Sequence, residues 1–157
     1  MNIGANTRYV FLYDATGPMT LRVYNGTAVT TYYYVRNLQG DIIAILNTAG
    51  KAVVEYTYDA WGNFITTPES GISEFDALVL HTYNPFRYRG YFYDVETGLY
   101  YLQSRYYNPE WGRFLNADAY LSTGQGILGY NMYAYCMNNP VNMSDPTGNW
   151  PKRVENT

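Results

Sequence analysis

Short runs of β-branched and aromatic residues alternate with polar turn residues along the first part of the chain. Runs of about four to eight such residues, bounded by Gly, Asn and Asp, predict strands that tight turns connect. The predicted strands lie at residues 9–13, 21–24, 27–35, 42–46 and 52–58. Asn25-Gly26 lies between two of them and predicts a hairpin with a type I′ turn, which needs φ > 0 at both central residues.

One turn pattern recurs, which indicates an internal repeat. It consists of a Tyr, an Asp or Asn, and a Gly three or four residues further on: Tyr13-Asp14-x-x-Gly17, Tyr58-Asp59-x-x-Gly62, Tyr93-Asp94-x-x-x-Gly98 and Tyr107-Asn108-x-x-x-Gly112. The Asp or Asn side chain can bond backbone amides within its own turn, and Gly tolerates the left-handed conformation. We therefore interpret these aspartates as turn-forming residues. Because one hairpin cannot bury its own face, we predict a mainly β fold of stacked antiparallel β-hairpins.

Five other segments are less regular. Residues 66–71 predict an exposed loop, and residues 73–80 predict a short helix, although a strand or loop also fits their pattern. Residues 99–107 predict one long strand, residues 122–126 a flexible segment, and residues 131–136 a short helix or a strand. Pro140 and Pro146 then restrict the last part of the chain to extended or turn conformations.

The composition narrows the function classes. The chain has 157 residues, including 20 Tyr and 14 Gly, and a formal net charge of −3. Scattered basic residues disfavour nucleic-acid binding, and no apolar segment is long enough to predict a membrane span. Cys136 and His81 are the single residues of their types, so the sequence predicts no Cys/His metal cluster and no cofactor, and both fit packing or surface roles. The first residues lack the layout of a signal peptide.

The segment from Asn84 to Tyr107 closely resembles the RHS-repeat-associated core domain, in the motif NPFRYRGYFYD-x-ETGLYYL-x-SRYY. The resemblance continues through Gly112-Arg113-Phe114, Asp118, Tyr133-Ala134-Tyr135, Asn138-Asn139-Pro140-Val141-Asn142 and Asp145-Pro146-x-Gly148. It implies four segments. These are YD-type β-hairpin repeats at residues 1–65, a loop or insertion at 66–83, the core domain at 84–148 and a short C-terminal tail at 149–157.

The resemblance also implies an architecture and partners. RHS and YD-repeat proteins, which include bacterial polymorphic toxins and the C subunits of insecticidal toxin complexes, wind β-hairpins into a hollow shell around a toxic C-terminal segment. We expect this chain to form part of such a β-shell, with a short irregular C-terminal plug. Expected partners are the remaining RHS/YD repeats of a longer chain or a second copy, with a C-terminal effector as cargo in full-length relatives. Those relatives imply a secreted or cell-surface location. Because the chain is far shorter than a full shell, we expect a C-terminal fragment or a degenerate stand-alone copy.

The family resemblance further implies an aspartic-type autoprotease that acts once in cis. By motif position, its catalytic residues are Asp118, Asp145 and Arg105. The cleavage region is Gly148, Asn149 and Trp150; family members often carry an apolar residue where this chain has Asn149. Two close carboxylates share a proton, so one can activate water while the other protonates the leaving group. A purely structural interpretation remains open, in which Asp145 starts a turn, Asp118 bonds backbone amides and Arg105 stacks on aromatic rings.

A function without catalysis is the alternative. The chain could be a β-repeat scaffold, a carbohydrate- or protein-binding surface, or an inert truncated remnant. Tyr32-Tyr33-Tyr34 and the set Tyr88, Tyr91 and Tyr93 would then offer rings for stacking, although packing between hairpins explains them equally well.

Overall fold

The computed structural model describes residues 7–65, 74–119 and 131–154, which form two compact units. The first unit contains Met1–Thr57 and Thr66–Gly90, and the second contains Tyr58–Ile65 and Tyr91–Thr157. The loop expected at residues 66–71 and the flexible segment expected at 122–126 lie outside the described residues. The four segments expected from the family resemblance, with boundaries after residues 65, 83 and 148, stay a prediction.

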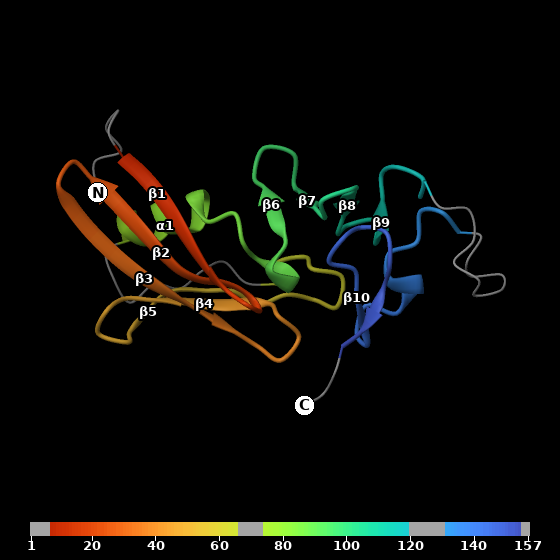
Figure 1. The fold of residues 1–157 in the computed structure, drawn as a ribbon, viewed down its shortest axis with the longest axis horizontal. Coiled ribbons are helices and arrows are strands. Elements are labelled where there is room, and N and C mark those ends of the chain that lie inside the picture. The colour runs from red at the N-terminus through yellow and green to blue at the C-terminus, as the bar shows by residue number, and fades with distance from the viewer. Residues whose placement is uncertain (1–6, 66–73, 120–130, 155–157) are drawn as a thin grey trace. The chain divides into compact units, whose positions relative to one another are not determined.

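The first unit is built on a five-stranded antiparallel sheet in which chain order and spatial order agree (Figure 1). Its strands are β1 (Thr7–Asp14), β2 (Gly17–Asn25), β3 (Ala28–Arg36), β4 (Ile42–Leu46) and β5 (Ala52–Glu55). All five strands were predicted from the sequence. The fifth is shorter than expected, because it ends at Glu55 and Tyr58 forms an isolated bridge with Phe64 instead.

The hairpin predicted at Asn25-Gly26 forms between β2 and β3, but its turn lies one residue later than expected. Asn25 pairs with Ala28, so the two loop residues are Gly26 and Thr27. Gly26 has φ 61° and occupies the first loop position, where a type II′ turn requires glycine. The sequence therefore located the hairpin correctly and assigned the wrong turn type, because Asn25 extends the strand.

The repeated Asp and Asn residues form turns, as predicted. Asp14 Oδ1 accepts hydrogen bonds from the amides of Thr16 and Gly17, at 2.7 and 3.0 Å. The same use of a side-chain oxygen recurs at Asn37, Asn47, Asp59, Asp94 and Asn108. These interactions are local in sequence, and this explains why the sequence pattern predicts them.

One helix accompanies the sheet of the first unit. Helix α1 (Glu74–Tyr83) confirms the helical alternative for this part of the chain, and its Val79 and Leu80 are buried. The helix ends before Asn84-Pro85, where Pro disfavours a further helical residue. The buried Asn84 side chain connects the end of the helix to the sheet side of the unit, because it accepts a hydrogen bond from the Tyr34 hydroxyl and donates one to the Tyr56 hydroxyl. A short 3-10 turn, η1 (Tyr88–Gly90), follows.

The second unit contains a four-stranded antiparallel sheet and a two-stranded one (Figure 1). The larger sheet consists of β6 (Phe92–Asp94), β7 (Leu99–Tyr101), β8 (Tyr106–Asn108) and β9 (Arg113–Phe114). The smaller sheet pairs β10 (Met143–Ser144) with β11 (Lys152–Arg153). A 3-10 turn, η3 (Cys136–Asn138), precedes β10. Residues 131–136 therefore form neither a regular helix nor a strand, and Ala134 makes a single bridge to Arg113.

The long strand expected at residues 99–107 is wrong. The chain reverses between β7 and β8, which pair with each other, so that Tyr101 lies opposite Tyr106. The amide of Leu102 donates to the carbonyl of Arg105 at 3.0 Å, and Gln103 takes the left-handed conformation with φ 65°. No Gly, Pro or Asn marks this turn in the sequence, and left-handed Gln is uncommon, so local patterns favour a strand.

The larger sheet of the second unit has one buried and one exposed face. Tyr100, Tyr107 and Phe114 lie on the buried face, where Tyr135 packs against the latter two. Cys136 is also buried, which fits the predicted packing role. Among the residues that the structure describes, no helix is long and apolar enough to cross a membrane.

Candidate functional site

The reverse turn between β7 and β8 positions Arg105 in the interior of the second unit. The Arg105 side chain is almost fully buried, and its guanidinium carbon lies 3.6 Å from the centroid of the Phe114 ring. Its Nη1 donates to the carbonyl of Met132 at 2.9 Å. The stacking on an aromatic ring that a structural role predicts is therefore present, and it also fixes the direction of the guanidinium.

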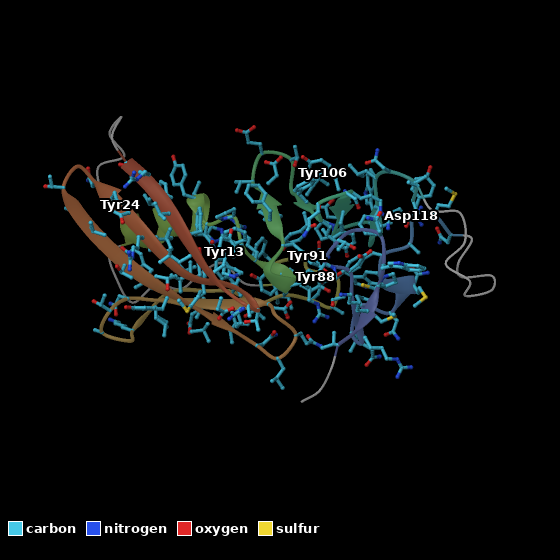
Figure 2. All side chains as sticks on the ribbon, viewed as in Figure 1. Tyr13, Tyr24, Tyr88, Tyr91, Tyr106 and Asp118 are labelled. Carbon is cyan, nitrogen blue, oxygen red and sulfur yellow. The ribbon has the colours of Figure 1, made fainter. Side chains whose placement is uncertain are left out.

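Two carboxylates meet at this guanidinium. Arg105 Nη2 lies 2.9 Å from Asp118 Oδ2 and 3.7 Å from Asp145 Oδ2, and both aspartates are buried. The amide of Asp118 donates to the carbonyl of Met132, the same carbonyl that Arg105 contacts. The amide of Asp145 donates to the hydroxyl of Tyr91, a buried residue that precedes β6. Figure 2 labels Tyr91 and Asp118. The three predicted residues thus come from separate segments and lie together.

The segment after Asp145 forms a tight turn that ends at Gly148. The amide of Gly148 points to the carbonyl of Asp145 at 3.4 Å, and Gly148 has φ 71°. A β-carbon on residue 148 would lie 2.7 Å from the carbonyl oxygen of Leu102 and 2.7 Å from Ser104 Oγ. Both the conformation and the available space therefore require glycine.

The peptide group between Gly148 and Asn149 contacts the cluster at both its ends. Arg105 Nε donates a hydrogen bond to the carbonyl oxygen of Gly148. The amide of Asn149 donates to Asp145 Oδ1 at 3.1 Å. Trp150 is exposed, and no hydrogen bond or ion pair connects this described residue to the cluster. Five of the six predicted site residues are therefore in one place.

Burial dominates the electrostatics of the site. It raises the pKa of the Asp145 carboxyl above its ordinary value, against the opposing effects of the Arg105 guanidinium and the amides of Asn149, Gly148 and Thr147. Burial also lowers the pKa of Arg105, while Asp118 and Asp145 act in the opposite direction. A buried carboxyl group whose pKa is raised, beside a buried cation, is a common feature of sites that transfer protons.

Sequence reasoning missed two residues that contact this turn. Tyr91 accepts the amide of Asp145, and Ser104 Oγ donates to the carbonyl of Thr147 at 2.7 Å. Ser104 precedes Arg105, and neighbouring residues of a strand point to opposite faces of a sheet. The predicted long strand therefore separated the two side chains, and the reverse turn brings both to the Asp145–Gly148 segment.

The tyrosines proposed as stacking platforms mostly serve packing. Four of these rings are buried, those of Tyr32, Tyr34, Tyr88 and Tyr91. Tyr93 is half-buried, and Tyr33 is the exposed member of the two rows. A different aromatic row reaches the surface in the second unit. Its members are Phe92, Tyr101 and Tyr106, which lie opposite one another across β6, β7 and β8.

The described residues contain no metal-binding cluster. Within residues 7–65, 74–119 and 131–154, no group of three or more His, Cys, Asp and Glu side chains is arranged to hold a metal ion. Asp118 and Asp145 instead share the Arg105 guanidinium.

A family model matches most of the chain. The family model described as Teneurin YD-shell matches residues 2–141. The tRNA nuclease WapA of Bacillus subtilis (strain 168) is 47% identical over 125 residues, which are 80% of this chain and 5% of the nuclease. The tRNA3(Ser)-specific nuclease WapA of Bacillus spizizenii is 42% identical over 146 residues, which are 93% of this chain and 6% of that protein. The chain thus spans about one twentieth of the length of these relatives.

A solved structure has the same fold. The crystal structure of TcdB2-TccC3-Cdc42 matches with a TM-score of 0.74 and 28% sequence identity. The match covers 91% of this chain and 6% of the chain in that structure. The predominantly antiparallel β architecture predicted from the sequence is confirmed.

Proposed function

Because the chain belongs to the Teneurin YD-shell family, as an RHS/YD-repeat protein, we propose that it is the C-terminal core of a β-shell and cuts its own backbone once, between Gly148 and Asn149. The cut separates the segment that follows Gly148 from the core. Self-cleavage of this kind is how a shell would release a C-terminal effector from covalent attachment.

One observation carries this proposal: both polar ends of the Gly148–Asn149 peptide group contact the Arg105 and Asp145 pair. The carbonyl oxygen receives a hydrogen bond from Arg105, and the amide donates to Asp145. A donor at the carbonyl oxygen stabilises the negative charge that develops there during hydrolysis. A carboxyl group beside the nitrogen can protonate it as it leaves.

The roles of the two aspartates follow from their contacts. Asp118, ion-paired to Arg105 Nη2, acts as the base that takes a proton from the attacking water. The water oxygen bonds to the carbonyl carbon of Gly148, and the carbon–nitrogen bond then breaks. Asp145 gives its proton to the nitrogen of Asn149. The products are a carboxyl group on Gly148 and an amine on Asn149, so one water is consumed and no other reactant is needed.

The pH dependence follows from the Asp145 carboxyl. Burial raises its pKa, so its protonated form persists to higher pH than in an exposed aspartate. Cleavage needs that proton, and the rate should therefore fall as pH rises through the raised pKa.

Intact-mass measurement of the purified full-length chain tests the proposal. Cleavage removes the peptide of residues 149–157, and Asp118→Asn and Asp145→Asn should each abolish the loss. Asp94→Asn is the matched control, because Asp94 forms a surface turn and asparagine preserves that turn. A parent chain that keeps its full mass through long incubation across the acidic and neutral pH range would refute the proposal.

A second candidate function is a binding surface for a carbohydrate or protein, favoured by the exposed row of Phe92, Tyr101 and Tyr106. Three neighbouring rings on one sheet face provide apolar area and stacking faces that cost little conformational entropy. Substitution of Tyr101 by Ala should abolish such binding and leave cleavage unchanged, which separates the two functions.

A further inference from the structure

Ser104 and Arg105 bind two successive carbonyl groups of the turn at the proposed cleavage point. Ser104 Oγ donates to the carbonyl of Thr147 at 2.7 Å, and Arg105 Nε donates to the carbonyl of Gly148. The peptide group that precedes the proposed cleaved bond is therefore tied to the same element that binds the carbonyl to be attacked.

The reverse turn between β7 and β8 makes this arrangement possible. Left-handed Gln103 turns the backbone, and the amide of Ser104 points back to the carbonyl of Leu102 at 2.7 Å. As a result, two adjacent side chains face one segment, which neighbours on a regular strand cannot do. Backbone strain of this kind needs support from the surrounding structure, and it clusters at functional sites.

Ser104 also forms part of the wall around Gly148. A β-carbon on that glycine would lie 2.7 Å from Ser104 Oγ, as close as it would come to the carbonyl oxygen of Leu102. The hydroxyl is thus in close contact with the backbone whose orientation the reaction needs. The Ser104 hydroxyl bonds the Thr147 carbonyl, and not the carbonyl carbon of Gly148 or the nitrogen of Asn149.

We propose that Ser104 is a positioning residue for the self-cleavage, which fixes the Thr147 carbonyl so that the Gly148–Asn149 peptide group stays aligned with Arg105 and Asp145. This inference rests on the proposed function. Ser104 orients the peptide bond that is cut, and the two aspartates transfer the protons. A hydrogen bond to one side of a reacting group matters because small displacements of that group reduce the rate strongly.

The position of Ser104 makes the role separable from folding. Ser104 is exposed, and its hydroxyl hydrogen bond goes to Thr147. Thr97 offers a matched control in the same unit, because its exposed hydroxyl donates to Asp94 Oδ2 at 2.8 Å, in the turn between β6 and β7. Each substitution removes one exposed hydroxyl that stabilises a turn. Of these two hydroxyls, only that of Ser104 contacts the segment to be cut.

The test compares cleavage rates of the full-length chain and its variants by intact mass. Ser104→Ala should cleave about tenfold more slowly, as expected for one lost hydrogen bond. Ser104→Thr should restore most of the rate, and Thr97→Ala should match the parent. The pH profile of Ser104→Ala should keep the parent's shape, since both carboxylates remain. A parental rate in Ser104→Ala, or a Thr variant as slow as the Ala variant, would overturn the proposal.

Amide hydrogen exchange separates this inference from the proposed function. In the Asp118→Asn chain, the added Ser104→Ala change should accelerate exchange at the amides of Gly148 and Asn149, and Thr97→Ala should not. If the parent chain never cleaves, the proposed function fails and the positioning role in catalysis fails with it. If the parent cleaves and exchange at these two amides is unchanged by Ser104→Ala, the inference about Ser104 alone is wrong.

Discussion

Substitution of Gly148 by Ala adds a single methyl group at the most tightly enclosed point of the site. The residue has φ 71°, a conformation that costs an L-amino acid about 1–2 kcal/mol. The new β-carbon would also lie 2.7 Å from the Leu102 carbonyl oxygen, a backbone atom of the reverse turn. That turn is held by its own hydrogen bonds, so relief of the contact must displace the Gly148 carbonyl from Arg105.

Gly50→Ala isolates the two contributions. Gly50 has φ 78° and its amide donates to the carbonyl of Asn47, as that of Gly148 does to Asp145, but a β-carbon there would meet nothing within 4 Å. Its substitution should therefore cost only the conformational penalty of about 1–2 kcal/mol. Gly148→Ala carries in addition an overpacking penalty of about 1–3 kcal/mol. The free energy of unfolding should fall by about 2–5 kcal/mol for Gly148→Ala, clearly more than for the control.

Urea unfolding followed by tyrosine circular dichroism measures the stability, and intact mass measures cleavage. We expect Gly148→Ala to cleave at least about 100-fold more slowly than the parent, because a displacement of about 1 Å at a reacting group has that effect. Gly50→Ala should cleave at the parental rate. A Gly148→Ala chain that unfolds like Gly50→Ala and cleaves at the parental rate would refute both the close contact and its proposed role.

Three further predictions concern other parts of the molecule. Arg105→Lys keeps the charge but loses the planar fork that contacts Gly148 and both carboxylates, so cleavage measured by intact mass should fall about 100-fold or more. Tyr107→Phe removes a 2.7 Å hydrogen bond to the carbonyl of Trp61, which should lower the free energy of unfolding by about 1 kcal/mol in urea titrations. Burial, with a smaller effect of a nearby arginine, lowers the pKa of His81 to about 4, below its ordinary value of 6.5. The unfolded chain therefore binds a proton at His81 more readily than the folded chain. The free energy of unfolding should decline by about 1–2 kcal/mol as pH falls from about 6.5 to about 4, after solvent screening is allowed for. His81→Gln should lessen that decline, and an unchanged pH dependence in this variant would contradict the prediction.

The family match and the turn chemistry explain how much of the fold was predictable. The turns at Asp14, Asp59 and Asp94 depend on side chains that bond amides two or three residues away, so short sequence patterns contain the needed information. The hairpin after Asn25 was predicted for the same reason. Its turn type was not, because the strand pairing extends one residue further than the pattern indicates.

The site was predictable in its residue types and not in its geometry. The motif identified Arg105, Asp118 and Asp145, whose catalytic roles stay a prediction. It could not show that Asp145 and Arg105 contact opposite ends of one peptide group, because that depends on the reversal at residues 102–105. Leu99 to Tyr107 contains residues that favour strands throughout, and nothing local in that segment marks the turn.

By itself, the sequence determined the turns that an Asp, Asn or Gly marks, and the Asp145-Pro146-x-Gly148 motif. These properties depend on neighbours along the chain. The tertiary structure alone decided that Ser104 binds the carbonyl of Thr147 and Arg105 that of Gly148. It also decided that Asp118 and Asp145 both lie at the Arg105 guanidinium. Both arrangements depend on contacts between segments far apart in sequence. Two of those segments provide the buried Phe114 ring and the carbonyl of Met132, which hold the Arg105 guanidinium in place.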